Sequence, residues 1–345
     1  MKIKKKGVIN LERWNIHVGD CLKELKKIEP ESVQTVVTSP PYWGLRDYDV
    51  DGQVGMENTP DEYVDGLVDV FREIRRVLKK DGTVWLNLGD SYGSGTTGRN
   101  DVERKYSGSI GKGLEFKKPT IKRHTENSPK NLVGIPWRVA FALQADGWYL
   151  RSDIIWHKPN PMPESVTDRP TKSHEYIFLL SKSPHYYYDA DAIRDPTADS
   201  TKQRYKYGWN GNEYRDYPSG GKANHFSKYI GSEKSRLDTD KGANKRDVWS
   251  VNTKSFPEAH FATFPEKLID TCIKAGTKEN DIVLDPFSGA GTTGVVACKL
   301  NRIYIGIELN PDYAEMSKNR LARTVGATEE QAKEMDSDGV QGSLL

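Results

Sequence analysis

The residues of this chain best suited to chemistry are Thr38-Ser39-Pro40-Pro41-Tyr42-Trp43, which follow a short β-branched run at 34–37. The run predicts a buried strand, and the two prolines must end it because neither can donate a hydrogen bond to a sheet. The turn therefore offers a hydroxyl, carbonyl oxygens without local N–H partners, and an aromatic ring. Such a set suits a flat ring that carries an amine, although an ordinary strand-ending turn explains these residues equally well.

A second candidate site is Gly289-Ala290-Gly291-Thr292-Thr293-Gly294, one of two stretches with the spacing G-x-G-x-x-G. The other, at 93–98, precedes no apolar helical face, so we reject it as a nucleotide loop. The accepted stretch follows a predicted strand, opens a predicted helix, and is followed by a strand that ends at Glu308. This order is typical of a βαβ nucleoside site, in which the glycines let the backbone approach the ligand and the acid binds ribose hydroxyls.

The residues directly before these glycines, Asp285-Pro286-Phe287-Ser288, indicate which nucleoside binds. A dinucleotide site places a glycine immediately after the strand, whereas here a carboxylate and an aromatic ring come first. A carboxylate suits a ligand that carries an ammonium group, as the methionine part of S-adenosylmethionine does. NAD has no such amine, and we therefore favour S-adenosylmethionine.

Alternating strands and helices must position these residues. Periodicity and capping signals predict strands at 14–18, 34–37, 83–88, 153–157, 176–180, 282–285 and 303–307. They predict helices at 21–28, from Thr59 to a terminator at 79–82, at 136–144, within 260–275 after Phe264-Pro265, at 292–300 and at 312–321. The alternation predicts an α/β fold, a doubly wound and mostly parallel sheet of the Rossmann-like type.

Positive charge is concentrated in two segments of a chain whose net charge is only +2 over 345 residues. Residues 92–130 carry nine Lys and Arg against four Asp and Glu, and residues 194–255 carry thirteen against eight. The rest of the chain is acidic, and this distribution favours a protein that holds phosphates at particular places, although solvated loops would show it too. From about 189 to 255 aromatic and basic residues alternate with few aliphatic ones, so the pattern excludes this segment from the sheet.

The remaining composition narrows the class of protein. Cys21, Cys272 and Cys298 are far apart, show no metal-ligand spacing and fall in apolar helical patterns, so we expect reduced core cysteines, no metal and a cytoplasmic location. No apolar run approaches the ~20 residues of a membrane span.

Taken together, the motifs resemble those of the amino-methyltransferases of DNA, specifically the beta class, in which the catalytic motif precedes the cofactor motif in a circularly permuted order. Thr38–Trp43 resembles the family's catalytic motif, 285–294 its cofactor loop, and Ile307-Glu308-Leu309-Asn310 its ribose-binding strand end. The segment 260–268 is similar to the one that covers the methionine side, Gly19-Asp20 stands where the family contacts adenine, and 169–175 resembles a segment beside the base pocket. The resemblance spans roughly 15–90, 131–190 and 255–322.

The resemblance implies a role for each matching residue. Ser39, Pro40, Pro41 and Tyr42 would be catalytic, and the cofactor would be bound by Asp20, Thr38, Thr263, Phe264, Pro265, Asp285, Pro286, Phe287, Ser288, Gly289, Gly291, Thr292, Thr293, Glu308, Leu309 and Asn310. Residues 1–190 would form the catalytic half with a mobile basic loop at 91–131, 191–255 the target-recognition region, 256–325 the cofactor half, and 326–345 a disordered acidic tail. The expected partners are double-stranded DNA and a cognate restriction endonuclease, with the enzyme a monomer or a homodimer.

The expected reaction is site-specific transfer of a methyl group to an exocyclic amine of a flipped base. Ser39 and the Pro40 carbonyl would accept the two amine hydrogens, while Tyr42 stacks on the base. Ser39 favours cytosine N4 over adenine N6, because the adenine enzymes of this family more often carry Asp or Asn at this position. Methylation of protein or RNA, a nicotinamide oxidoreductase and a non-catalytic DNA-binding module are weaker alternatives.

Overall fold

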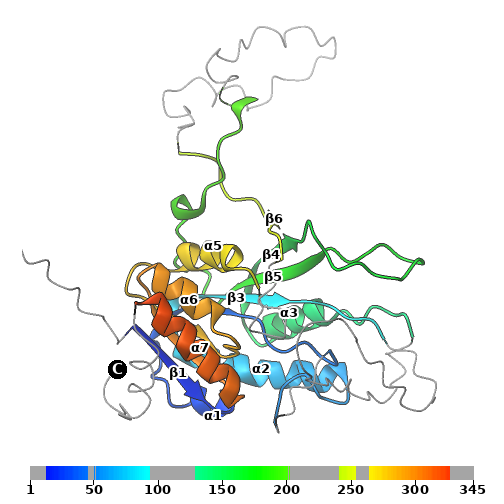
Figure 1. Cartoon of the computed structure of the whole chain (residues 1–345), viewed down its shortest axis with the longest axis horizontal. Helices are drawn as coiled ribbons and strands as arrows, with labels where there is room; N and C mark the ends of the chain where they lie inside the picture. Colours follow the sequence, from blue (N-terminus) through cyan, green and yellow to red (C-terminus); the bar gives the residue numbers. More distant parts are fainter. Residues whose placement is uncertain are drawn as a thin grey trace, which may run out of the picture. The chain divides into compact units, whose positions relative to one another are not determined.

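The computed structural model describes residues 13–45, 50, 52–93, 129–200, 202, 241–253 and 264–326. The chain divides into two compact units, one made of Met1–Tyr188 with Asp247–Leu345 and the other of Asp189–Arg246. The first unit holds an eight-stranded sheet in the order β1-β8-β7-β2-β3-β5-β4-β6 (Figure 1). No helix within the described residues is long and apolar enough to span a membrane.

The sheet confirms the prediction of a doubly wound, mostly parallel arrangement. Its strands are β1 Trp14–Val18, β2 Val33–Thr38, β3 Leu78–Leu88, β4 Tyr149–His157, β5 His174–Ser181, β6 Val248–Ser250, β7 Ile282–Asp285 and β8 Ile303–Glu308. Only β5 runs against its neighbours β3 and β4 among these strands. Residues 158–173 join β4 to β5 without a helix, whereas parallel neighbours are usually joined by a helical crossover.

Helices cover both faces of the sheet. They are α1 Cys21–Leu25, α2 Pro60–Val77, α3 Ile135–Ala145, α5 Glu266–Gly276, α6 Thr292–Lys299 and α7 Pro311–Thr324. The first three pack on one another and form one layer, and the last three form the other (Figure 1). The buried side chains between α2 and the sheet, such as Tyr63, Leu67 and Phe71, make up much of the core.

The order of strands reverses between β2 and β7, which lie side by side in the sheet. From β2 the chain proceeds to β3 on one side, and from β7 it proceeds to β8 on the other. Ligands of open parallel sheets bind at the carboxyl ends of the strands beside such a reversal. Ser39 follows β2 directly and Asp285 ends β7, so both predicted motifs stand at this switch point.

Helix α2 begins as predicted but ends earlier. Thr59 Oγ1 accepts the Glu62 N–H at 3.1 Å, the Glu62 carboxylate accepts the Asn58 N–H at 3.0 Å, and Pro60 occupies the first turn. The predicted terminator at 79–82 is wrong, because the helix ends at Val77 and these residues begin β3. The cation that binds the last carbonyls is Lys182, which follows β5 and donates to Arg75 O and Leu78 O. A cap supplied from so far along the chain has no local signal.

Two further predictions need correction. The helix predicted at 21–28 ends at Leu25, because the N–H groups of Lys27 and Ile28 donate to carbonyls only three residues earlier. The aromatic and basic segment from 189 to 255 does not lie wholly outside the sheet, since residues 248–250 form the edge strand β6 beside β4. The remaining strands and helices lie within a few residues of their predicted bounds.

The second unit and the basic loop are described only in part. In the second unit, Asp195 pairs with Ala243 in an antiparallel bridge, and its carboxylate accepts a hydrogen bond from Lys245 Nζ at 2.7 Å. At the ends of the basic loop, Gly93 and Asn131 are joined by a backbone hydrogen bond of 2.8 Å. Residues 94–128 and 327–345, and with them most of the predicted mobile loop and the acidic tail, lie outside the described residues.

Candidate active site

A cavity of about 260 Å³ opens at the carboxyl ends of the strands around the switch point. Most of the predicted site residues line it: Asp20, Ser39, Pro40, Pro41, Tyr42, Phe264, Asp285, Pro286, Phe287, Ser288, Gly289, Thr292, Thr293, Glu308, Leu309 and Asn310. Thr38, Pro265 and Gly291 belong to the same segments without lining the cavity, and Thr263 lies outside the described residues. Segments from opposite ends of the chain thus meet at one edge of the sheet, as a switch point requires.

Asp285 joins the two central strands beneath the cavity. Its side chain accepts hydrogen bonds from Thr38 Oγ1 at 2.7 Å, from Thr293 Oγ1 at 2.8 Å and from the Phe287 N–H at 3.1 Å. Only 1% of Asp285 is exposed. Burial raises its pKa to about 6, against the opposing effect of these three donors. Thr38 therefore contacts the cavity only through Asp285, whose carboxylate it holds.

Glu308 connects the glycine loop to the end of β8. One of its carboxylate oxygens accepts the Gly289 N–H at 2.7 Å and the other accepts the Asn310 N–H at 2.9 Å. A carboxylate has about four lone-pair positions, so this one keeps acceptor capacity on the side of the cavity. Burial raises the pKa of Glu308 above its ordinary value, and the two N–H groups counteract this shift. The loop and the carboxylate therefore hold each other in place.

The glycine loop depends on a backbone conformation that only glycine adopts easily. Gly289 and Gly291 have φ values of 51° and 74°, and α6 begins immediately afterwards. A Cβ atom on Gly291 would lie 2.1 Å from Ser317 Oγ of α7. Gly291 therefore allows α7 to pack closely against the loop. Separately, the apolar rings of Phe264 and Phe287 form part of the cavity wall.

Asp20 both caps helix α1 and lines the cavity. It is the N-cap of α1, where its side chain accepts the Lys23 N–H at 3.1 Å, and it also lines the cavity. The capping bond orients the carboxylate at the end of β1, next to the Glu308 end of the parallel strand β8.

The Pro-Pro turn is held by helix α2 and by the loop that precedes it. The Tyr63 hydroxyl donates to the Pro41 carbonyl at 2.9 Å, and the Trp43 indole N–H donates to the Glu57 carbonyl at 2.9 Å. Tyr63 is fully buried, so the turn rests on the core. The Pro41 carbonyl is therefore already engaged by a side-chain donor.

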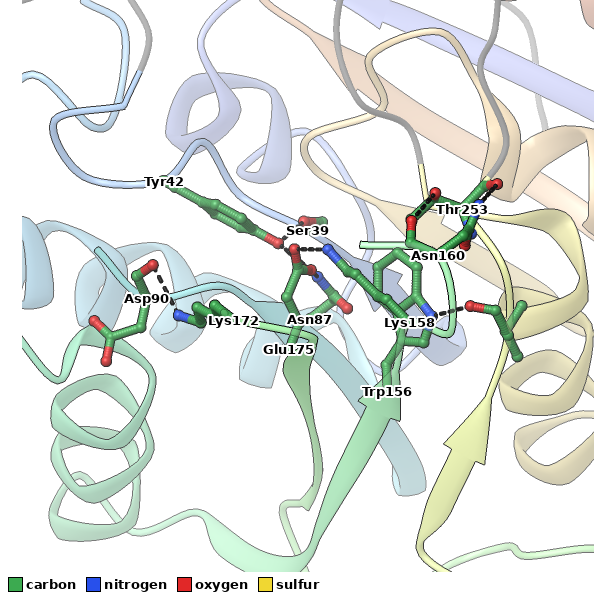
Figure 2. A network of polar contacts seen from close by, with 11 residues as sticks. Ser39, Tyr42, Asn87, Asp90, Trp156, Lys158, Asn160, Lys172, Glu175 and Thr253 are labelled. Carbon is green, nitrogen blue, oxygen red and sulfur yellow. Dashed lines mark hydrogen bonds and ion pairs between the residues drawn. The ribbon is translucent and has the colours of Figure 1, made fainter. Parts of the chain in front are cut away.

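The hydroxyl of Tyr42 lies in a polar network that the sequence analysis did not identify (Figure 2). It donates to Glu175 Oε2 at 2.8 Å and accepts from Asn87 Nδ2 at 2.6 Å, while Lys158 Nζ donates to the other oxygen of Glu175. Burial and the nearby Glu175 charge raise the pKa of Tyr42 well above its ordinary value. Tyr42 therefore remains a protonated donor.

The other residues of this network come from the ends of different strands. Asn87 lies near the end of β3, Lys158 follows β4, and Glu175 lies at the start of β5. Glu175 belongs to the polar segment 169–175 that the sequence analysis placed beside the base pocket, but nothing local distinguishes Asn87 or Lys158. The antiparallel pairing of β4 with β5 brings Lys158 and Glu175 together.

Comparisons with known proteins agree with this geometry. The family model described as DNA methylase matches residues 33–319, so the chain belongs to the DNA methylase family. It is 45% identical over 314 residues to the type II methyltransferase M.SmaI of Serratia marcescens, covering 91% of this chain and 92% of that protein. It is 44% identical over 320 residues to the type II methyltransferase M.Cfr9I of Citrobacter freundii, covering 93% and 91%.

Solved structures show the same fold. The PvuII DNA methyltransferase, described as cytosine-N4-specific, has a TM-score of 0.61 at 19% identity and covers 96% of this chain and 94% of its own. TTHA0409, a putative DNA modification methylase from Thermus thermophilus solved with S-adenosyl-L-methionine, has a TM-score of 0.55 at 22% identity, covering 91% and 95%. The resemblance to beta-class amino-methyltransferases is thereby confirmed, and the protein is an amino-methyltransferase of DNA.

Proposed function

We propose that this enzyme transfers a methyl group to the exocyclic N4 of a cytosine that is flipped out of duplex DNA at a specific site. The observation that carries the proposal is the shared cavity in which the Ser39-Pro40 turn meets the Asp285 and Glu308 loops. The turn presents acceptors for an amine, and the loops present what a nucleoside cofactor with an ammonium group requires.

The methyl donor is S-adenosylmethionine, and the residues present fit it. Glu308 keeps acceptor capacity for ribose hydroxyls after binding two backbone N–H groups. Asp20 lines the cavity at the end expected for the adenine, and Phe264 and Phe287 provide apolar walls. Asp285 supplies a buried negative charge for the ammonium group. When bound, the cofactor supplies a methyl group on a positively charged sulfur.

The enzyme's own residues act on the base. An exocyclic amine is a poor nucleophile, because its lone pair is delocalised into the ring. Ser39 Oγ and the Pro40 carbonyl accept the two amine hydrogens and so localise that lone pair on nitrogen. Fixed positioning of this kind removes roughly 7–11 kcal/mol of a barrier. Stacking on Tyr42 contributes ~1–3 kcal/mol toward the few kcal/mol that extruding the base costs.

The assignment of cytosine depends on the residue at position 39. Ser39 is a neutral acceptor with a short side chain, and it resembles the residue of cytosine-N4 enzymes rather than that of most adenine-N6 enzymes. Adenine N6 is therefore the alternative that the experiment must separate. A companion restriction endonuclease is the partner that we propose, since the relatives are named type II methyltransferases.

Target recognition falls to residues 191–255, between the catalytic half at 1–190 and the cofactor half at 256–325. Residues 194–255 have a net charge of +5, with aromatic and amide residues interleaved. Lys and Arg would contact phosphates, and Tyr, Asn and Arg would contact base edges.

The test is to incubate the protein with duplex DNA and S-adenosylmethionine labelled in its methyl group, then digest the DNA to nucleosides. Chromatography and mass spectrometry should find N4-methylcytosine. N6-methyladenine without N4-methylcytosine would overturn the choice of base, and absence of both would overturn the proposed function.

In the same assay, Ser39→Ala should lower kcat about 10- to 100-fold, because one acceptor for the amine is lost. The dissociation constant for DNA should change much less. Ser32→Ala is the matched control, since Ser32 lies before β2 and its hydroxyl donates to Glu29 O at 2.8 Å, away from the cavity. Equal losses in kcat and DNA affinity would mean that Ser39 only builds the turn.

A further inference from the structure

The hydrogen-bonding capacity of the Tyr42 hydroxyl is completely used. A phenol has one proton to donate and two lone pairs to accept with. The oxygen donates to Glu175 Oε2 at 2.8 Å and accepts from Asn87 Nδ2 at 2.6 Å and from Ser39 Oγ at 3.4 Å. The 3.4 Å contact is longer than the usual 2.7–2.8 Å, as hydrogen bonds in active sites often are before substrate binds.

The chemistry of the partners dictates the direction of these bonds. The Asn87 amide nitrogen can only donate, and it also donates to Glu175 Oε2 at 2.8 Å. An ionised Glu175 can only accept, so the proton of Tyr42 must point toward it. Tyr42 then meets Ser39 as an acceptor, and the Ser39 proton points toward Tyr42. What Ser39 turns toward the cavity is its lone pairs.

Lys158 forms an ion pair with Glu175 in this half-buried place. Its ammonium group donates to Glu175 Oε1 and lies 4.3 Å from the centre of the Trp156 ring. The ring is itself fixed, because the Trp156 indole N–H donates to Val251 O at 2.8 Å (Figure 2). The side chains of Lys158 and Glu175 are only 19% and 15% exposed, so solvent screens this pair weakly.

We propose that Glu175, held by Lys158, is a positioning residue that sets the direction of the hydroxyl chain from Ser39 through Tyr42 to the carboxylate. The target amine therefore meets Ser39 as an acceptor only, and the partial positive charge that grows on the amine faces a chain that ends in a negative charge. Lys158 and Asn87 hold the two ends of this arrangement. The inference rests on the proposed function of Ser39, which it deepens.

The decisive variant is Glu175→Gln, which keeps the shape of the side chain. Its oxygen can still accept from Lys158, but its amide nitrogen would face Tyr42 as a donor. Tyr42 must then turn its proton away from residue 175, which favours a Ser39 hydroxyl pointing into the cavity. We expect kcat to fall about 10- to 100-fold with little change in the dissociation constants of S-adenosylmethionine and DNA.

A double-mutant cycle with Tyr42→Phe separates this effect from a structural one. Removing the Tyr42 hydroxyl interrupts the hydroxyl chain between Ser39 and Glu175. Adding Glu175→Gln to Tyr42→Phe should therefore lower kcat by less than about twofold. The matched control is Glu164→Gln, the same change on the connection between β4 and β5. The Glu164 carboxylate pairs with Arg169 and not with the hydroxyl chain of Ser39 and Tyr42. Its kcat should equal that of the wild-type enzyme.

The outcomes are distinct. If Glu175→Gln lowers kcat by the same factor with and without the Tyr42 hydroxyl, the proposed chain is wrong, although the proposed function stands. No methylated base from the wild-type enzyme would overturn both. If Glu175→Gln does not fold, judged by its binding of S-adenosylmethionine, Lys158→Met takes its place in the cycle and should show a smaller loss that again disappears with Tyr42→Phe.

Discussion

At the scale of single residues, the site is built from carboxylates that are buried and bonded before any ligand arrives. Asp285 accepts from three donors and Glu308 from two backbone N–H groups, and burial raises the pKa of both. Keeping such groups charged opposes folding, and a cationic ligand relieves that opposition. The affinity of the cavity for an ammonium group is therefore linked to the stability of the empty protein.

Asp285→Asn should remove a pH dependence of stability. The pKa of Asp285 is about 6 in the folded protein and its ordinary value is 3.8. The folded state therefore holds this proton more tightly, and the favourable contribution, complete below pH 4, is lost as pH rises to about 6. The difference of about two pKa units corresponds to about 3 kcal/mol.

Urea unfolding at several pH values between 4 and 7, without cofactor, measures this effect. The stability of the wild-type protein relative to Asp285→Asn should fall by about 3 kcal/mol across this range. Asp281→Asn, just before β7, is the matched carboxylate-to-amide control. Parallel curves for wild type and Asp285→Asn would contradict the assignment.

At the scale of elements, the end of β3 supports the Pro-Pro turn that follows β2. Asn87 bonds to Tyr42 and Glu175, and Gly89 lies against the Tyr42 ring. The next residue, Asp90, accepts the N–H groups of Gly134 and Ile135 and so fixes the start of α3. Three neighbouring residues of one strand end therefore serve the turn, the polar network and a helix.

Gly89→Ala should damage the enzyme through Tyr42. A Cβ atom at position 89 would lie 2.6 Å from Cε2 of the Tyr42 ring, so the ring must move and its bonds to Glu175 and Asn87 must weaken. We expect a loss of stability of about 1–3 kcal/mol, typical of overpacking, with a fall in kcat of at least about 10-fold.

Gly66→Ala is the control for this prediction, because a Cβ at position 66 meets nothing within 4 Å. Gly66 lies inside α2, where alanine should raise stability by about 0.5–1 kcal/mol and leave kcat unchanged. Chemical unfolding and steady-state kinetics of the two variants provide the comparison. A Gly89→Ala enzyme with wild-type kcat would show that the position of the Tyr42 ring is unimportant.

At the scale of the whole molecule, the sheet with its cavity and much of the positive charge belong to different parts of the chain. The sheet and its cavity belong to the unit formed by Met1–Tyr188 and Asp247–Leu345, while much of the positive charge lies in 194–255. We infer a division of labour in which one unit binds the cofactor and performs the transfer and the other selects the DNA sequence.

Replacing residues 189–246 by a flexible Gly/Ser linker should therefore separate the two tasks. Calorimetry should find an unchanged affinity for S-adenosylmethionine, because every described residue of the cavity lies outside the replaced segment. Site-specific methylation should disappear, and the dependence of DNA binding on salt concentration should become weaker as phosphate contacts are lost. Methylation of the original site by this variant would contradict the assignment of 191–255.

Much of the site follows from the sequence because its signals are local. Two prolines end β2 wherever it lies, glycines permit the positive φ values at 289 and 291, and a carboxylate at the end of a strand meets the ligand edge of a parallel sheet. These residues predicted the fold class and the place of the proposed cofactor loop and reacting turn, because none of these signals depends on long-range contacts.

Only the tertiary structure decided what surrounds Tyr42. Asn87, Lys158 and Glu175 lie at the ends of β3, β4 and β5, and they meet because β5 runs antiparallel between the other two strands. The capping of α2 by Lys182 and the edge strand β6 depend on the same long-range pairing. Strand pairing and the contacts it creates are set by burial across the whole sheet, which no short stretch of sequence encodes.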